Sequence, residues 1–349
     1  MRIATFTHIS DLHIGRQNLE ESLDAAVIRP WAALPWFDGL LGHSYDSLAK
    51  LDKLFRRLLK DEDAKLIFTG DLTSMGHPDE FVLGESFLDG DLTPPYGNFI
   101  GLQCPDWRTR SVSGNHDHWP GSPVFGLPGD ALYKAFRFCP FMSPLIDLPT
   151  GHKLRFAGID TDGDVNPMGL CRLLARGAFL GQLAELDKKM PPPEPSEIRA
   201  LVLHHSICWQ GLALSIGGAS RSALSDFARK KGISVLLCGH THVPKVELVS
   251  LSTGKENVAL NACCGSSSRI TTLPFDLTLV GQRVDRPTWI PNSVLVHRLI
   301  AEKGGLQWQV SILFETSHGF EENAKYPMRA NAGLYFPKGR GLPDEAQSH

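Results

Sequence analysis

Residues 233–242 read ISVLLCGHTH, an apolar run that ends in Gly239-His240-Thr241-His242. The run before the glycine has the length and composition of a short buried strand. In an extended segment, side chains two residues apart point to the same side, so His240 and His242 present two imidazoles to one space. One such pair is weak evidence for a metal site, and its weight depends on the rest of the chain.

Five other apolar runs are followed by Asp, Asn or His in the same way. These runs predict strands at residues 2–9, 64–69, 109–113, 154–159 and 198–203. The polar residues behind them are, in the same order, Asp11-Leu12-His13, Gly70-Asp71, Gly114-Asn115-His116-Asp117, Asp160 and His204-His205. In layered α/β folds, sites form on loops at the carboxyl ends of strands. We therefore expect these polar loops to lie close together.

Apolar residues recur at helical spacing between the predicted strands. This spacing predicts helices at residues 48–59, 180–186 and 221–231,. Ser44, Asp46 or Ser47 is available as the N-cap of the first helix,. Alternation of strands and helices indicates an α/β layered architecture.

The domain organisation follows from composition along the chain. Segments near residues 17–42, 74–106 and 119–148 are rich in aromatic residues, Gly or Pro and are interpreted as insertions. Two further strands are expected at residues 294–300 and 306–314, before a polar tail. We expect one catalytic core over residues 1–265 with these insertions and a C-terminal extension over residues 266–349, rather than two independent domains.

Composition excludes several classes of protein. The chain has 349 residues, 42% of them hydrophobic, which is enough for a full core,. Its net charge of −3 argues against a protein that grips nucleic acid by charge,. We expect no signal peptide, no membrane span and, because the seven cysteines form no CxxC pair, neither a disulfide framework nor a thiolate zinc site,. The expected location is the cytoplasm.

The polar loops supply the ligands of a metal centre. The candidates are two carboxylates, four imidazoles and one amide oxygen, from Asp11, Asp71, His13, His204, His240, His242 and Asn115. This set is too large for one tetrahedral metal and fits two metals that share a carboxylate. Mixed imidazole and carboxylate ligands suit Mn, Fe, Zn or Co and disfavour Ca.

Charge indicates the kind of substrate. Two divalent ions exceed the charge of Asp11 and Asp71, so the centre stays positive and suits a phosphate ester. Two metals about 3.5–4 Å apart can hold a phosphoryl group and activate a water for in-line attack by hydroxide. His116 adjoins Asn115 and is predicted to protonate the leaving group. Asp117 either orients His116 or caps the following turn.

The motifs together resemble those of the calcineurin-like metallophosphoesterases, a family of dinuclear phosphoesterases, over about residues 1–265. The blocks DxH, GDxx, GNH with an acidic residue, a strand-end His and GHxH all occur here in order. The resemblance implies a four-layer α-β-β-α sandwich of two mixed β-sheets flanked by helices. It also implies two divalent or mixed-valence transition-metal ions, with Mn, Fe or Zn as the favoured metals.

The resemblance further assigns roles to individual residues. It implies that Asp71 bridges the metals and that His116 is the acid. The implied ligands of the first metal are Asp11, His13 and His242, and those of the second are Asn115, His204 and His240.

The fourth block departs from the family pattern. It often reads HHP, whereas here it reads His204-His205-Ser206. We take His204 as the ligand because it directly follows the apolar run, with His205 as the alternative. Asp160 resembles a family residue that supports the site without binding metal, and His118 is a candidate for the substrate pocket.

The other histidines are assigned to the scaffold. His8 is expected to pack in the first strand. The remaining ones are expected on the surface or in loops, among them His43, His152 and His297.

The most specific of these predictions concerns the substrate class. The block order looks most like that of bacterial class III cyclic-nucleotide phosphodiesterases, which implies small phosphodiesters such as cyclic nucleotides. The alternatives are a phosphomonoesterase acting on proteins or nucleotides, then a nuclease, which the acidic balance disfavours. A non-catalytic binding module is disfavoured because every expected ligand is present. Neither a membrane nor nucleic acid is expected as a partner, and the oligomeric state stays open.

Overall fold

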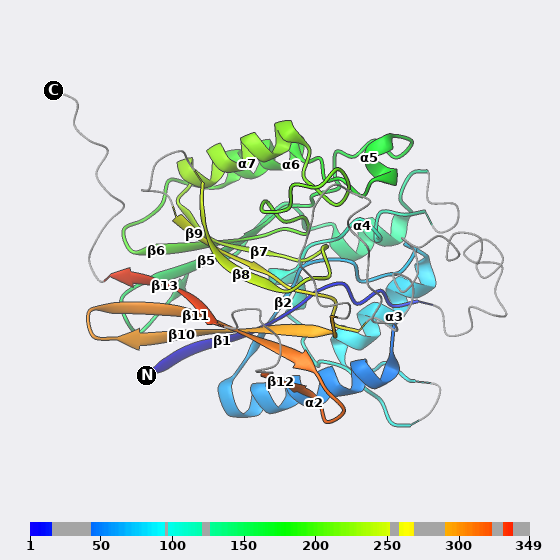
Figure 1. Ribbon diagram of the computed structural model, residues 1–349, viewed down its shortest axis with the longest axis horizontal. Helices are drawn as coiled ribbons and strands as arrows, with labels where there is room; N and C mark the ends of the chain where they lie inside the picture. Colours follow the sequence, from blue (N-terminus) through cyan, green and yellow to red (C-terminus); the bar gives the residue numbers. More distant parts are fainter. Residues whose placement is uncertain are drawn as a thin grey trace.

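The computed structural model describes residues 1–15, 43–94, 97–120, 126–251, 258–268, 290–322 and 331–337. The insertion predicted near residues 17–42 lies outside them. The described chain forms two β-sheets packed face to face, with helices on both outer faces (Figure 1). Both sheets contain parallel and antiparallel neighbours. The predicted four-layer α-β-β-α sandwich of two mixed sheets is therefore confirmed.

The first sheet is built around β1 (Arg2–Ile9), which runs parallel to β2 (Lys65–Phe68) and antiparallel to β10 (Ser293–Glu302). The other strands of this sheet are β11 (Gly305–Glu315), β12 (Phe320–Glu321) and β13 (Asn331–Pro337). Their order is β12-β11-β10-β1-β2, and β13 also pairs with β11. The strands predicted at 294–300 and 306–314 therefore extend the sheet that holds β1.

The second sheet has a parallel centre. It consists of β3 (Phe141–Met142), β4 (Ile146–Asp147), β5 (Lys153–Gly158), β6 (Glu197–Val202), β7 (Ile233–Cys238), β8 (Lys245–Ser250) and β9 (Val258–Cys263). The order is β3-β5-β6-β7-β9-β8, with β4 also paired to β5. β5, β6, β7 and β9 run parallel, so their carboxyl ends lie at one edge.

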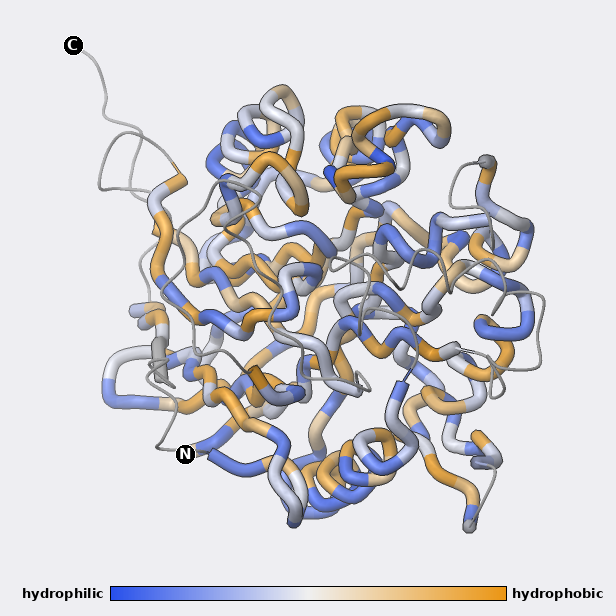
Figure 2. The backbone as a smooth tube through the Cα atoms, turned by 45° about the vertical axis from the view of Figure 1, so that its right-hand side comes forward, coloured by the Kyte–Doolittle hydropathy of each residue, from blue (hydrophilic) through white to orange (hydrophobic). Residues whose placement is uncertain are grey.

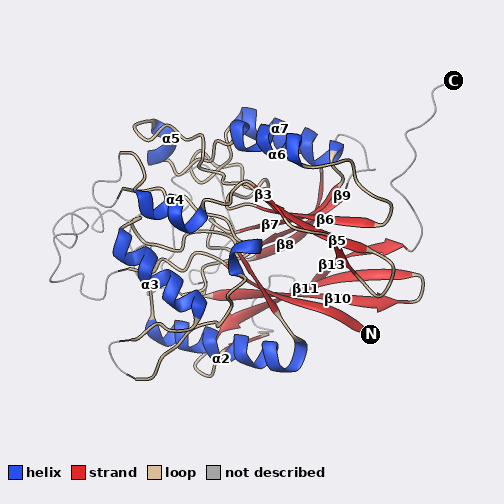
Figure 3. Cartoon of the chain, turned by 180° about the vertical axis from the view of Figure 1, so that it is seen from behind, coloured by secondary structure: helices blue, strands red, loops and turns tan. Residues whose placement is uncertain are grey.

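Helices cover both outer faces (Figure 3). The helices are α2 (Tyr45–Glu62), α3 (Pro78–Asp89), η1 (Trp107–Arg110), α4 (Asp130–Phe136), α5 (Leu170–Leu173), α6 (Leu180–Lys189) and α7 (Gly218–Lys230). The helix predicted at 48–59 is α2, and Ser44 is its N-cap, accepting a hydrogen bond from the backbone N–H of Ser47. Hydrophobic and hydrophilic residues alternate along the helices, as expected for helices with one buried face (Figure 2),.

Three apolar cores separate the four layers. Phe6, Phe156 and Trp308 belong to the core between the two sheets. A second core joins α2 to the outer face of the first sheet, and a third joins α6 and α7 to the outer face of the second. In β6, Ala200 faces the inter-sheet core and Leu201 faces the helices, which is the alternation expected of a strand buried on both faces,.

The strand predicted at residues 109–113 is wrong. Residues Trp107–Arg110 form a 3₁₀-helix, and only one bridge, between Phe68 and Ser111, connects this segment to β2. The fully buried Trp107 and the bond from Arg110 Nε to the Leu66 carbonyl, at 2.9 Å, hold the segment in this form. The chain thus crosses the end of β2 and delivers Gly114 and Asn115 to the site without a strand.

Several buried histidines belong to the scaffold. His8 is fully buried in β1, as predicted. His43, His152 and His297 were expected on the surface or in loops. His43 and His152 are buried but lie between named elements, whereas His297 is buried within β10, where the expectation is wrong. The neighbouring residues in the sequence did not reveal this burial, because the packing partners come from distant segments. Among the described residues, no helix combines the length and apolarity that crossing a membrane requires.

Candidate metal centre

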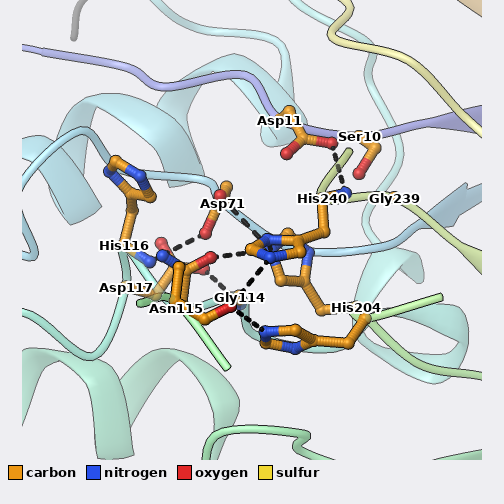
Figure 4. A network of polar contacts seen from close by, with 12 residues as sticks. Ser10, Asp11, Asp71, Gly114, Asn115, His116, Asp117, His204, Gly239 and His240 are labelled. Atoms are coloured by element: carbon orange, nitrogen blue, oxygen red, sulfur yellow. Dashed lines mark hydrogen bonds and ion pairs between the residues drawn. The ribbon is translucent and has the colours of Figure 1, made fainter. Parts of the chain in front are cut away.

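The loops that follow β1, β2, β6 and β7 bring Asp11, Asp71, His204 and His240 together (Figure 4). The Asp11 N–H donates to the Gly70 carbonyl at 2.9 Å, which links the first two loops. The His240 N–H donates to Asp11 Oδ2 at 3.0 Å, which links the two sheets. The structure brings together all seven predicted ligands: Asp11, His13, Asp71, Asn115, His204, His240 and His242.

The first cluster holds Asp11, His13, Asp71 and His242, whose ligand atoms all lie within 4.8 Å of one another. His242 Nε2 is 3.3 Å from Asp11 Oδ1 and 3.3 Å from His13 Nε2. His13 Nε2 is 3.8 Å from Asp71 Oδ2. Two carboxylates and two imidazoles therefore converge on one point, a donor set that suits Mn, Fe or Zn.

The second cluster holds Asp71, His204 and His240. His204 Nε2 is 3.3 Å from Asp71 Oδ2, 3.1 Å from His240 Nδ1 and 3.2 Å from Asn115 Oδ1. Asp71 belongs to both clusters, with Oδ2 between His13 and His204. This is the position that a bridging carboxylate requires.

Hydrogen bonds on the far side of two imidazoles fix which nitrogen faces the centre. His204 Nδ1 donates to the Thr69 carbonyl at 2.6 Å, and His240 Nε2 donates to the Ala175 carbonyl at 3.1 Å. In the neutral rings, His204 Nε2 and His240 Nδ1 therefore both present lone pairs, although they face each other at 3.1 Å,. A cation between them removes this repulsion, and such outer contacts are typical of imidazoles that bind metal.

The carboxylates also fit a cation. Each has one oxygen held by a backbone N–H: Asp11 Oδ2 by His240 and Asp71 Oδ1 by His116. The other oxygens, Asp11 Oδ1 and Asp71 Oδ2, are buried without a hydrogen-bond partner among the described residues. A buried carboxylate oxygen without a donor is costly. Both point at the imidazole nitrogens, so the residues present fit two metal ions.

The pKa shifts in the site also favour a positive charge beside the carboxylates. Burial lowers the pKa of His204, but Asp71 beside it more than offsets this and raises the pKa to about 10. Burial raises the pKa of Asp71, yet His204 and His116 hold it well below its usual range. Burial, together with neighbouring histidines, lowers the pKa of His13 and His240 well below the usual value. The two carboxylates thus favour positive charge in the space between the imidazoles.

Five of the seven ligands have left-handed backbone conformations. Their φ angles are 52° for Asp11, 48° for His13, 56° for Asp71, 72° for His240 and 55° for His242. Non-glycine residues adopt this region uncommonly, at a cost of about 1–3 kcal/mol each. The sharp turns that follow β1, β2 and β7 thus fold each side chain back over the end of its own strand.

Glycine permits the close contact between two of these loops. Gly70 has a φ of 96°, and a Cβ there would lie 2.7 Å from both Gly114 N and His204 Nδ1. Both distances are shorter than a van der Waals contact. The Gly-Asp and Gly-Asn motifs recognised in the sequence are therefore the points where the loops touch.

His116 lies at the rim of the first cluster. Its Nδ1 donates to the Ser74 carbonyl at 2.8 Å, which leaves Nε2 as the nitrogen for proton transfer. Its ring centroid lies 4.5 Å from that of His13, in an edge-on arrangement. Trp119 covers the other side, with ring centroids 3.9 Å apart. Trp119 was predicted at the start of an insertion; it lies three residues after His116, and the turn between them brings the two rings together.

Asp117 caps backbone groups instead of orienting the His116 side chain. Oδ1 accepts from the Thr73 N–H and hydroxyl, and Oδ2 accepts from the Leu72 and Gly114 N–H groups. These donors all precede Asp117 in the chain, so the contacts differ from both predicted roles, which were to orient His116 or to cap the following turn. Asp117 therefore ties the loop that carries Asp71 to the loop that carries Asn115.

The remaining predicted residues surround the second cluster. His118 Nε2 donates to Asp160 at 2.8 Å; burial lowers the pKa of His118, but Asp160 more than offsets this and raises it. His205 donates from Nε2 to Ala175 at 3.1 Å, and its Nδ1 accepts from Thr161 at 2.8 Å. Both nitrogens of His205 are thereby occupied, so His204, not His205, faces the cluster.

Three comparisons relate the chain to known proteins. No curated protein matches the chain. Among solved structures, it is similar to Vps29 from Chaetomium thermophilum, with 12% sequence identity over 99% of this chain and 100% of that chain and a TM-score of 0.34. The family model for calcineurin-like phosphoesterases matches residues 4–244. This match covers more than half of the sequence and every ligand loop, and the chain belongs to the calcineurin-like phosphoesterase family.

Proposed function

We propose that this protein is a phosphoester hydrolase that uses two metal ions, with Asp71 as the bridging ligand. The observation that carries the proposal is the position of Asp71 Oδ2, buried without a donor between His13 and His204 at 3.8 and 3.3 Å. Asp11, His13 and His242 would complete the first site. Asn115, His204 and His240 would complete the second.

When bound, divalent ions at these sites supply a Lewis acid for the phosphoryl group and an activated water. The described residues contribute two carboxylates to the centre, Asp11 and Asp71, so its charge stays positive with two divalent ions present and attracts an anionic ester,. Asp11 and Asp71 are positioned before any ion binds, because a backbone N–H holds one oxygen of each. The chain thus preorganises the ligands rather than relying on the ions to collect them.

His116 is the proposed acid that protonates the leaving oxygen. Its bond to the Ser74 carbonyl places the proton on Nδ1 in the neutral ring, so protonation of the ring puts the transferable proton on Nε2,. Trp119 packs against the ring and limits its rotation. The ring is only 5% exposed, so the proton passes to substrate in a site that largely excludes bulk water.

The proposed substrates are small phosphodiesters such as cyclic nucleotides, with phosphomonoesters as the alternative class. The proposed compartment is the cytoplasm, which the seven free cysteines support,. The proposed metals are Mn, Fe or Zn, because the clusters mix imidazole nitrogen with carboxylate oxygen,.

Metal analysis tests the centre directly. Metal-free protein titrated with Mn²⁺ is expected to bind two ions per chain. Asp71→Asn should weaken both sites, whereas Asn115→Ala should weaken one. Asp130→Asn, on the exposed face of α4, removes the same charge and should leave both sites unchanged. Failure of the wild type to bind any transition metal would overturn the proposal.

Leaving-group dependence tests His116. His116→Ala should retain both metals and slow esters with poor leaving groups by about 10²–10⁴-fold, the range typical of general acid catalysis. Activated aryl esters need little protonation and should slow much less. Equal slowing of both classes would remove His116 from the role of acid.

A substrate panel separates the candidate classes. Cyclic nucleotides, nucleotides, phosphopeptides and glycerophosphodiesters, each assayed with Mn²⁺, are expected to give the highest kcat/KM with a diester. A clear preference for monoesters would favour the phosphatase alternative. Absence of turnover across the panel, in protein that holds two metals, would favour a binding module.

A further inference from the structure

A chain of hydrogen bonds runs across four neighbouring strands of the first sheet and ends beside the second metal cluster. Trp308 Nε1 lies 3.1 Å from His297 Nδ1, and His297 Nε2 lies 3.2 Å from His8 Nδ1. His8 Nε2 lies 3.0 Å from the Thr69 hydroxyl. The members come from β11, β10, β1 and the end of β2, and the three ring side chains are fully buried.

The direction of every bond in this chain follows from its first member. An indole N–H can only donate, so His297 Nδ1 must accept. His297 then carries its proton on Nε2 and donates to His8 Nδ1. His8 in turn carries its proton on Nε2 and donates to the Thr69 hydroxyl oxygen.

This assignment requires neutral rings, and the surroundings keep them neutral. Burial lowers the pKa of His297 to about 3. Burial, with His297 adding to it, lowers the pKa of His8 well below its usual value. The two rings lie 5.3 Å apart between centroids, within the apolar core that contains Phe6 and Trp308. Among the described residues, no acidic side chain forms an ion pair with either imidazole.

Thr69 connects this chain to the metal centre. Its carbonyl accepts from His204 Nδ1 at 2.6 Å, and its N–H donates to the Ile9 carbonyl at 3.2 Å. It directly precedes Gly70 and Asp71, whose φ angles of 96° and 56° make a strained turn. The bond from His8 therefore fixes the residue whose carbonyl holds His204 Nδ1.

We infer that Trp308, His297 and His8 are positioning residues that act through Thr69 to orient His204 toward the second metal ion. The chain transmits orientation because each bond has only one possible direction. Loss of the indole N–H frees His297 to adopt either tautomer, and His8 then no longer donates to Thr69 in every molecule. The effect is expected at the second site, since none of the ligands confined to the first cluster contacts Thr69 in the described structure.

Trp308→Phe tests the inference with a closely matched control. Trp107 is also fully buried and also donates one indole hydrogen bond, to Asp89 at 3.2 Å, but it lies in the core under α3. Both variants remove one N–H and similar volume from a core. Mn²⁺ affinity is measured calorimetrically on metal-free protein, and the second site is identified as the binding step that Asn115→Ala weakens.

The expected result is a roughly tenfold weaker second site in Trp308→Phe, at the lower end of the effect of outer contacts on metal affinity. The first site should be unchanged, and Trp107→Phe should leave both sites unchanged. Equal affinities in both variants and the wild type, or equal weakening of both sites in both variants, would overturn the inference.

A second measurement needs no variant and no metal. The ¹⁵N chemical shifts of the imidazoles in metal-free wild type should show His8 and His297 both protonated at Nε2 and unprotonated at Nδ1. The opposite tautomer, or an average of the two, would overturn the inference. The affinity measurement rests on the proposed function, whereas the tautomer measurement does not, so a failure of one proposal can be distinguished from a failure of the other.

Discussion

Replacement of Gly70 with alanine is expected to destabilise the fold and the metal centre together. Gly70 has a φ of 96°, and its missing Cβ would lie 2.7 Å from Gly114 N and from His204 Nδ1. Two costs therefore add. The backbone conformation costs an L-residue about 1–2 kcal/mol, and forcing the neighbours apart costs about 1–3 kcal/mol.

Gly151 provides a control that isolates the two terms. It has a φ of 83°, and no heavy atom lies within 4 Å of its absent Cβ. Gly151→Ala should therefore lose only the conformational term, about 1–2 kcal/mol. Gly70→Ala should lose roughly 2–5 kcal/mol, which is a large share of the stability of a typical domain. Because His204 must also move, its affinity for metal should fall.

Equilibrium urea unfolding followed by circular dichroism measures the first effect, and Mn²⁺ titration of metal-free protein measures the second. The difference in unfolding free energy between the two variants is the steric term alone. Equal destabilisation by both substitutions would refute the tight contact between the Asp71 and Asn115 loops. Unchanged Mn²⁺ affinity in Gly70→Ala would refute the link between that contact and His204.

Three further predictions address the core, the C-terminal strands and the metals. Burial lowers the pKa of His297 to about 3 in the folded protein. Between about pH 6.5 and 3, the unfolded chain therefore binds more protons at this residue than the folded chain does,. The free energy of unfolding should fall as the pH falls through this range, by up to about 1.4 kcal/mol per pH unit. In His297→Leu, the slope of unfolding free energy against pH should be flatter in acid denaturation. An unchanged slope would contradict this role of His297. A chain truncated after residue 265 loses β10 and β11, with Trp308 and Phe314 from the core, and should not show a cooperative thermal transition. Mn²⁺ at about 100 times its Kd should stabilise the metal-free protein by about 2.7 kcal/mol for each site filled, seen as a higher Tm; an unshifted Tm would argue against binding to the folded state.

The fold could be predicted from the sequence wherever the pattern of apolar residues within a segment indicated a strand or a helix. The apolar run at 2–9 coincides with β1, and the helical spacing at 48–59 lies within α2. The segment at 109–113 misled because Val112 is buried in the core between the sheets although the segment makes only a single bridge to β2 among the described residues. The place of β10 beside β1 could not be deduced, because β-pairing across nearly 300 residues depends on the whole topology.

The site was more accessible to sequence reasoning than its surroundings were. Motifs such as Gly239-His240-Thr241-His242 place ligands at fixed positions behind strands, so their convergence follows from the topology of a few loops. The choice between His204 and His205 followed the strand end and agrees with the contacts of both. The contacts of Asp117, Trp119 and Thr69 depend on how loops fold over one another, and no spacing rule encodes that.

The left-handed backbone conformation of the metal-ligand residues sets selection for stability against selection for metal binding and catalysis. At His13 and His242, a glycine would relieve about 1 kcal/mol or more of backbone strain while deleting an imidazole,. A library screened only for heat resistance, without metal, should therefore accumulate glycine at these two positions. A library screened for turnover should exclude it. Histidine at a backbone angle that favours glycine thus marks a position where chemical function outweighs stability.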